Sequence, residues 1–175
     1  MPLNYCREHS KQKMNKKLLN CLTDVGLTEV IYEKYREFPS NGLSETQLTG
    51  KILFEYLDHL KKKDRDIPYH NFSMSFFTIA LMELENENPF FNFAYESRRC
   101  KLLDYQQSGV VTKVQILTAG EKSCENCREL DGRILPIDVA LMTMPIPCKN
   151  CVHWVTEVTE IGWCRCVYSP IVDDE

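Results

Sequence analysis

Two short cysteine motifs carry the clearest chemistry in this chain, Cys124-Glu-Asn-Cys127 and Cys148-Lys-Asn-Cys151, and 20 residues separate them. They are called the first hook and the second hook below. A Cys-x-x-Cys turn directs two sulfurs at one centre, so two such turns supply the four thiolates of a tetrahedral metal site. The spacing predicts a zinc site whose ligands are Cys124, Cys127, Cys148 and Cys151.

A zinc ion held by four thiolates has no coordination position left for water. The predicted zinc is therefore structural and does not act as a Lewis acid. An iron–sulfur centre is the alternative metal, because iron–sulfur clusters also take cysteine thiolates. Two further interpretations are reduced core cysteines and a redox hook of the thioredoxin kind, and the presence of two hooks at zinc spacing disfavours both.

A third motif, Cys164-Arg165-Cys166, follows the hooks. If residues 163–168 form a strand, side chains two apart point to the same face, so these two thiols lie side by side. They are either two small side chains packed on a buried face or, together with His153, part of a second metal set. Both interpretations stay open at this stage.

The remaining three of the nine cysteines stand singly on predicted helices: Cys6, Cys21 and Cys100. We expect them in the core, because free cysteine is among the most buried residue types. Cys6 and His9 are one helical turn apart and form an alternative ligand pair.

A catalytic alternative centres on His153, two residues after the second hook. A histidine there is what a ββα metal-dependent nuclease would offer, and His153 with acids such as Glu157 would bind a second, catalytic ion. Such a nuclease also needs a catalytic histidine before the second hook, and none lies between Cys127 and Cys148. No nucleophile elbow, phosphate-binding glycine loop or His-Glu-x-x-His motif occurs either. We therefore expect a protein that is not an enzyme, with a degenerate HNH-like nuclease as the alternative.

The charge pattern favours a protein partner over nucleic acid. The chain has a net charge of -4, and residues 121–152 contain four positive and five negative side chains. A nucleic-acid-binding ribbon would be basic there. A nucleic-acid-binding regulator, using the basic residues of 11–17 or 61–65 as phosphate contacts, remains a second alternative.

Helical periodicity dominates the first 108 residues. We predict helices over residues 11–22, 27–38, 44–60 and 72–84, followed by one from Asn88-Pro89 to about residue 107. Ser44-Glu45-Thr46-Gln47 has the form of a capping box. The helix over 72–84 is apolar on most sides, which places it at the centre of the helical region. Ser108-Gly109 ends the last helix.

The pattern changes to β-branched residues after Gly109. Residues 110–118, 152–158 and 163–168 are predicted strands, with a turn at 159–162. The fold class is thus α+β: an N-terminal helical bundle over 1–108 and a small zinc-bound β-rich module over 109–175, which can pack as one body. With no apolar run of about 18 residues and a polar N-terminus, we expect a cytoplasmic protein without a membrane segment.

Part of the chain resembles a known family. The matching motifs are Glu96-Ser97-Arg98, Ser108-Gly109-Val110, the first hook with Leu130-Asp131-Gly132-Arg133, and Pro145-Ile146-Pro147 with the second hook. Together, over about Ala94 to His153, they resemble the C-terminal region of phage Mu F-like head morphogenesis proteins, which are minor capsid proteins.

In that family the second segment reads His-Pro-Asn-Cys-Arg-Cys. Cys148 stands at its histidine, Cys151 at its first cysteine and His153 at its second, while a Cys-Arg-Cys occurs later in this chain, at Cys164 and Cys166. The resemblance covers about one third of the chain and does not extend to the helical region. It implies a phage capsid or portal protein as the partner and association with the virion. The expected function is a zinc-stabilised protein-interaction module.

Overall fold

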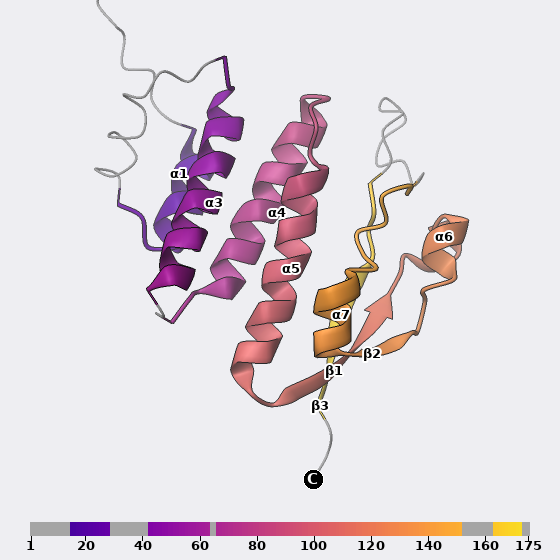
Figure 1. Ribbon diagram of the computed structural model, residues 1–175. Helices are drawn as coiled ribbons and strands as arrows, with labels where there is room; N and C mark the ends of the chain where they lie inside the picture. The colour runs from indigo at the N-terminus through magenta and orange to yellow at the C-terminus, as the bar shows by residue number, and fades with distance from the viewer. Residues whose placement is uncertain (1–14, 29–41, 64–65, 152–162, 173–175) are drawn as a thin grey trace, which may run out of the picture.

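The computed structural model describes residues 15–28, 42–63, 66–151 and 163–172, and their architecture is α+β, as predicted. Four longer helices come first along the chain, and a three-stranded antiparallel sheet with short helices follows (Figure 1). The longer helices are α1 (Lys16–Asp24), α3 (Glu45–Lys62), α4 (Tyr69–Glu85) and α5 (Phe91–Ser108).

Helix α3 begins at the predicted capping box. The Ser44 hydroxyl accepts a hydrogen bond from the Gln47 amide at 3.1 Å, and the Gln47 side chain accepts one from the Ser44 amide at 3.1 Å. Two amide groups at the start of the helix are thereby satisfied. The buried stripe of the helix, which includes Ile52, Leu53 and Leu57, faces α1 and α4.

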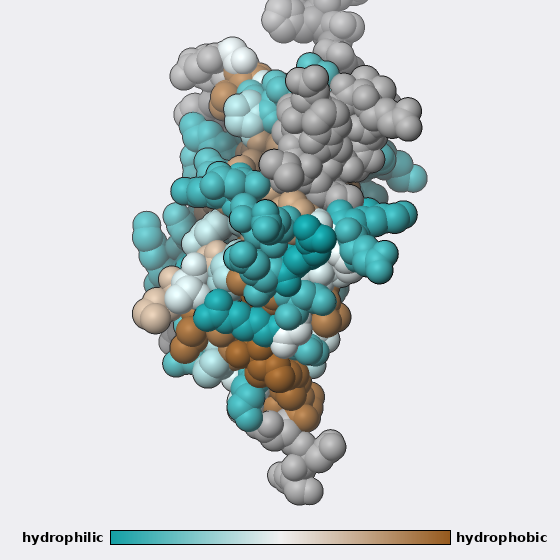
Figure 2. Space-filling view, turned by 90° about the vertical axis from the view of Figure 1, so that its right-hand side faces the viewer, coloured by the Kyte–Doolittle hydropathy of each residue, from teal (hydrophilic) through white to brown (hydrophobic). Residues whose placement is uncertain are grey.

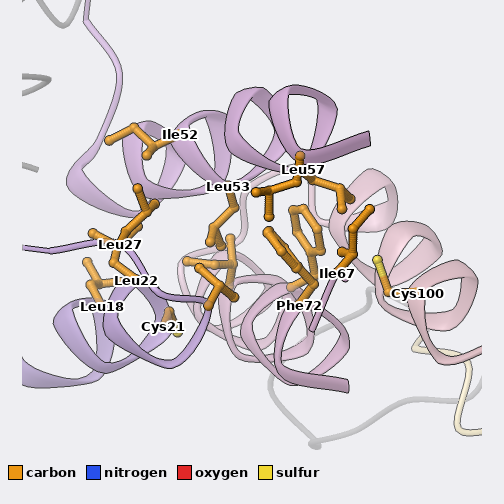
Figure 3. Close-up of a cluster of buried hydrophobic side chains, with 14 residues drawn as sticks. Leu18, Cys21, Leu22, Leu27, Ile52, Leu53, Leu57, Ile67, Phe72 and Cys100 are labelled. Atoms are coloured by element: carbon orange, nitrogen blue, oxygen red, sulfur yellow. The ribbon is translucent and has the colours of Figure 1, made fainter. Parts of the chain in front are cut away.

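Helix α4 lies at the centre of the helical region, as its apolar surface predicted. It contacts α1, α3 and α5, and Phe72, Phe76 and Ile79 are fully buried. Figure 3 shows the resulting core, in which Leu53 and Leu57 of α3 lie next to Phe72, and Leu18 and Leu22 of α1 lie further along with Leu27. Residues 11–14 and 29–38 of the first two predicted helices lie outside the described residues, and α1 is described from Lys16.

The predicted start of the fifth helix, at Asn88-Pro89, is wrong: α5 begins at Phe91. The Glu87 and Asn88 amides donate to the carbonyls of Leu84 and Glu83, so these residues close the end of α4 instead of opening a new helix. The end of α5 is as predicted, because Gly109 adopts φ 73°. That left-handed conformation is easily adopted only by glycine and ends a helix.

The sheet has the order β2-β1-β3. Strand β1 (Val111–Leu117) matches the predicted strand over 110–118, and it pairs on one side with β2 (Ile134–Pro136) and on the other with β3 (Val167–Val172). The prediction of a strand over 163–168 is only partly right. Its pairing begins at Val167, opposite Leu117, because β1 ends there and offers no partner to residues 163–166. The predicted strand 152–158 and turn 159–162 lie outside the described residues.

Helix α5 connects the helical region to the sheet. It packs against α4 on one side and against β1, β3 and α7 (Ile137–Thr143) on the other, and Figure 1 shows it between them. Leu102 of α5 is fully buried in one core cluster with Val114 and Ile116 of the sheet. The division at residues 108 and 109 stays a prediction. No described helix has the length and apolar character required to span a membrane.

Candidate metal centre

The first hook forms a single helical turn after β1. Cys124 caps the four-residue helix α6 (Glu125–Arg128), and its carbonyl accepts hydrogen bonds from the amides of Cys127 and Arg128, each at 3.0 Å. This turn brings the side chains of Cys124 and Cys127 to one side. The chain fragment between β1 and β2 is short and polar, so it has little apolar surface to bury apart from the two cysteines.

A turn after the first hook joins it to the sheet. Asp131 accepts hydrogen bonds from the Thr118 amide at 3.0 Å and from the Thr118 hydroxyl at 2.9 Å. Gly132 adopts φ 72° and donates to the carbonyl of Ile116 at 2.9 Å. The Leu-Asp-Gly segment therefore anchors the hook to the end of β1, and this gives the segment a positional role that the sequence did not reveal.

The second hook follows α7. Its turn is closed by a hydrogen bond from the Cys151 amide to the Cys148 carbonyl at 3.3 Å, the counterpart of the bond in the first hook. Helix α7 precedes the second hook and packs against β1 and β2, with Ala140 fully buried in the sheet core.

The two hooks come together, although 20 residues separate them. The Cys127 sulfur lies 3.6 Å from that of Cys148 and 3.8 Å from that of Cys151, and the Cys124 and Cys151 sulfurs are 3.8 Å apart. Sulfurs at the corners of a tetrahedron with metal–sulfur bonds of about 2.3 Å are separated by about 3.8 Å. The observed spacing is therefore compatible with a bound metal ion.

Cys164 and Cys166 join the hooks. The Cys164 sulfur is 3.8 Å from that of Cys127, and interactions with the thiols of Cys148, Cys164 and Cys127 raise the pKa of Cys166. Both residues are buried while Arg165 between them is exposed, so they do share one face. Hereafter the cysteine cluster means the six residues Cys124, Cys127, Cys148, Cys151, Cys164 and Cys166.

Within the cysteine cluster, two groups of three sulfurs lie within 4.8 Å of one another. They are Cys124, Cys127 and Cys151, and Cys127, Cys148 and Cys164. Cys127 belongs to both groups. The predicted four-ligand set is thus brought together but is divided between two groups, and each group holds one sulfur fewer than a tetrahedral site needs.

Hydrogen bonds within the cysteine cluster determine which of its sulfurs carries negative charge. Bonds from Cys148 and Cys166 lower the pKa of Cys164 to about 2. Sharing a proton with Cys164 raises the pKa of Cys148 to about 11, and burial raises the pKa of Cys127 above its usual range. Charge therefore gathers on Cys164, because closely spaced sulfurs cannot all ionise without a compensating cation.

Arg98 of α5 is a cation next to this charge. Its guanidinium lies 5.7 Å from the centre of the Phe77 ring, and its Nε is buried without a hydrogen-bond partner among the described residues. Burial lowers the pKa of Arg98, while the nearby Cys164 and Cys166 raise it. The sequence predicted no role for Arg98.

The other two cysteines that the structure describes take no part in the cluster. Cys21 and Cys100 are buried in the helical core, as predicted, where their thiols lie 3.9 Å from the Ser75 carbonyl and from Glu96, respectively. Burial raises the pKa of both thiols. The predicted alternatives that involve Cys6, His9 or His153 lie outside the described residues.

A cavity of about 450 Å³ opens beside the second hook. Phe90, Phe91 and Trp163 line it together with Cys148, Cys151 and Cys164. It gives a solvent-side approach to the cluster, which a metal ion needs in order to enter.

Comparison of the chain with models of protein families, with curated proteins and with solved structures gave no match.

Proposed function

We propose that the chain is a non-enzymatic protein-interaction module whose sheet region is held together by zinc. The observation that carries this proposal is the set of sulfur separations of 3.6 to 3.8 Å between the two hooks. Thiolates are soft ligands, and a tetrahedral all-sulfur set favours zinc or iron–sulfur. Zinc is preferred because four thiolates brought by two short hooks form the usual structural zinc site.

A structural role agrees with the way the cysteine cluster is built. Four thiolates occupy every position of a tetrahedral ion, which leaves none for a substrate or a catalytic water. The loop that carries the first hook contains few buried apolar side chains of its own: within residues 118–133, Cys127 is the only buried hydrophobic residue. Metal binding would then supply folding free energy that this loop cannot obtain from apolar burial.

An interaction role is supported by the outer face of the sheet. Leu117 and Val167 face each other on β1 and β3, and each is 41% exposed, while Ile134 of β2 is 54% exposed. Figure 2 shows hydrophobic residues gathered on the lower part of the side of the molecule that carries the sheet. Contiguous exposed apolar side chains are typical of protein-binding surfaces.

The resemblance to Mu F-like head morphogenesis proteins suggests the partner. On that basis we infer a capsid or portal protein of a phage or prophage, with the chain in the cytoplasm during assembly and associated with the virion afterwards. The net charge of -4 argues against a general attraction to nucleic acid.

The zinc part of the proposal is tested with the double variant C124S/C148S, which removes one sulfur from each hook. We expect elemental analysis to find the wild-type chain loaded with zinc and the variant depleted of it. Circular dichroism should show loss of strand signal with most helical signal retained, because the helical core contains neither residue. An unchanged zinc content in the variant would contradict the proposal.

A further inference from the structure

The cysteine cluster contains more sulfur than one zinc ion can use. A tetrahedral ion takes four thiolates, whereas six sulfurs form one connected group here. Two of the six, Cys127 and Cys148, lie between the hook cysteines Cys124 and Cys151 and the pair Cys164 and Cys166. Cys127 belongs to both three-sulfur groups, and Cys148 shares a turn with Cys151 while its sulfur lies in one three-sulfur group with those of Cys127 and Cys164.

We propose that the cysteine cluster binds two zinc ions, bridged by the sulfurs of Cys127 and Cys148. The proposal rests on the proposed function in one respect, namely that the metal is zinc. One ion takes the two bridging sulfurs with Cys124 and Cys151, which is the set that the two hooks predict. The other takes the same two sulfurs with Cys164 and Cys166.

The coordination numbers agree with this assignment. Two four-coordinate ions need eight ligand positions, and six thiolates fill eight positions when two of them bridge. Each three-sulfur group then lacks one sulfur, Cys148 in the first and Cys166 in the second. Both residues are near the group that they would complete: the Cys148 sulfur is 3.6 Å from that of Cys127, and Cys166 is buried two residues after Cys164, where the Cys148 and Cys164 thiols raise its pKa.

The distance between the proposed bridging sulfurs fits the edge shared by two tetrahedra. The Cys127 and Cys148 sulfurs are 3.6 Å apart, the shortest of the four sulfur–sulfur distances given above. With zinc–sulfur bonds of about 2.3 Å, two ions on either side of this edge lie ~3 Å apart. Electrostatic repulsion between two ions at that distance draws the bridging sulfurs together, so a short shared edge is expected.

Arg98 supplies an independent argument for the second ion. A buried cation needs a partner of opposite charge, and among the described residues no carboxylate forms an ion pair with Arg98. The neighbouring Glu96 pairs instead with Arg99, at 2.9 Å. The groups next to Arg98 are Cys164 and Cys166. Negative charge gathers on Cys164 even without a metal, so Arg98 already has one anionic neighbour; a second ion would make Cys166 a thiolate as well.

The first test measures stoichiometry on the intact chain, reconstituted with zinc chloride under reducing conditions. We expect native mass spectrometry and elemental analysis to give two zinc ions per chain. X-ray absorption at the zinc edge should show a zinc–zinc distance of ~3 Å, as the shared edge requires. One zinc per chain would overturn the two-ion cluster and leave the proposed function intact, and no zinc would overturn both.

Paired serine variants test the assignment of the ligands. C164S/C166S should lower the zinc content from two ions to one, and so should C124S/C151S. The control C21S/C100S removes two buried cysteines of the helical core and should keep two ions. If C164S/C166S retained the wild-type zinc content, the second ion would not be where we place it.

The bridges are tested by ¹¹³Cd NMR of the wild-type chain loaded with cadmium. Two resonances that are scalar-coupled to each other are expected, because coupling between the metals passes through shared sulfurs. Two uncoupled resonances would indicate separate sites and overturn the bridged cluster. This measurement needs no variant, so it does not depend on whether the serine variants fold.

Discussion

At the scale of single residues, the cysteine cluster is defined by which sulfurs reach Cys127. Cys148 and Cys151 come from the second hook and Cys164 from the segment before β3, and all three sulfurs lie within 3.8 Å of it. A thiol at such a junction has a raised pKa because it is buried among other sulfurs. A metal ion reverses this preference, since it stabilises the thiolate form of every ligand.

Arg98 is the residue outside the cluster with the strongest predicted effect on it. Replacing the guanidinium with an apolar side chain of similar length, in Arg98→Met, should weaken zinc binding by about 10–100-fold, because the partner of the ligand sulfurs is lost. Competition with a chromophoric chelator measures the affinity. Arg128→Met is the matched control: Arg128 lies next to the first hook but is exposed, so its loss should leave the affinity within about threefold. Equal weakening in both variants would refute a specific role for Arg98.

At the scale of elements, the two faces of the sheet have different roles. Its inner face carries Val114, Ile116 and Tyr168 and packs on α5 and α7, whereas its outer face exposes Leu117, Ile134 and Val167. Alternation of side chains along a strand makes this separation possible. Strand β3 also carries the Cys164 and Cys166 segment to the cluster, so the sheet positions the metal ligands and the proposed docking surface together.

The outer face of the sheet is tested with I134K/V167K. These side chains are exposed, so we expect the fold and the zinc content to be retained while binding to the partner is lost, because two charges would be buried in the interface. The measurement is co-purification of the intact chain with the proposed capsid or portal partner. M142K, which adds a charge at a methionine of α7 that is 79% exposed, is the control and should bind normally. Retained binding by I134K/V167K would exclude this face.

At the scale of the whole molecule, α5 and Trp163 tie the cysteine cluster to the helical region. Trp163, next to Cys164, packs against Phe77 of α4 at 5.8 Å and against Phe90 at 5.2 Å between ring centres. The helical core itself, around Phe72 and Phe76, contains no cluster cysteine. The two regions are therefore in contact but bury separate sets of side chains.

Removal of the metal should affect the two regions unequally. With a chelator present, we expect amide hydrogen exchange to become at least about tenfold faster in β1 and β3 and to change little in α3 and α4. The reason is that the sheet core includes the cluster sulfurs, while the helical core depends on leucine and phenylalanine packing. Uniform acceleration over all of these elements would show that the chain unfolds as a single unit when metal is removed.

Local interactions explain what the sequence predicted correctly. The capping box at Ser44 and Gln47, the end of α5 at Gly109 and the strand before Thr118 each depend on residues within a few positions. The hooks are local in the same sense, because each is a single turn closed by its own backbone hydrogen bond. The start of α5 was placed wrongly because Asn88-Pro89 also suits the end of α4, and a short sequence pattern does not distinguish these two uses.

The sequence by itself thus determined the α+β class, the two hooks and the residue types suited to a metal. Only the tertiary structure decided that the hooks meet, that Cys164 and Cys166 join them and that Arg98 stands beside those two sulfurs. The physical reason is the range of the contacts. Cys164 reaches Cys127 because β3 pairs with β1, and Arg98 reaches the cluster because α5 packs on the sheet. Such placements are set by burial of the shared core, which no local spacing of residues encodes.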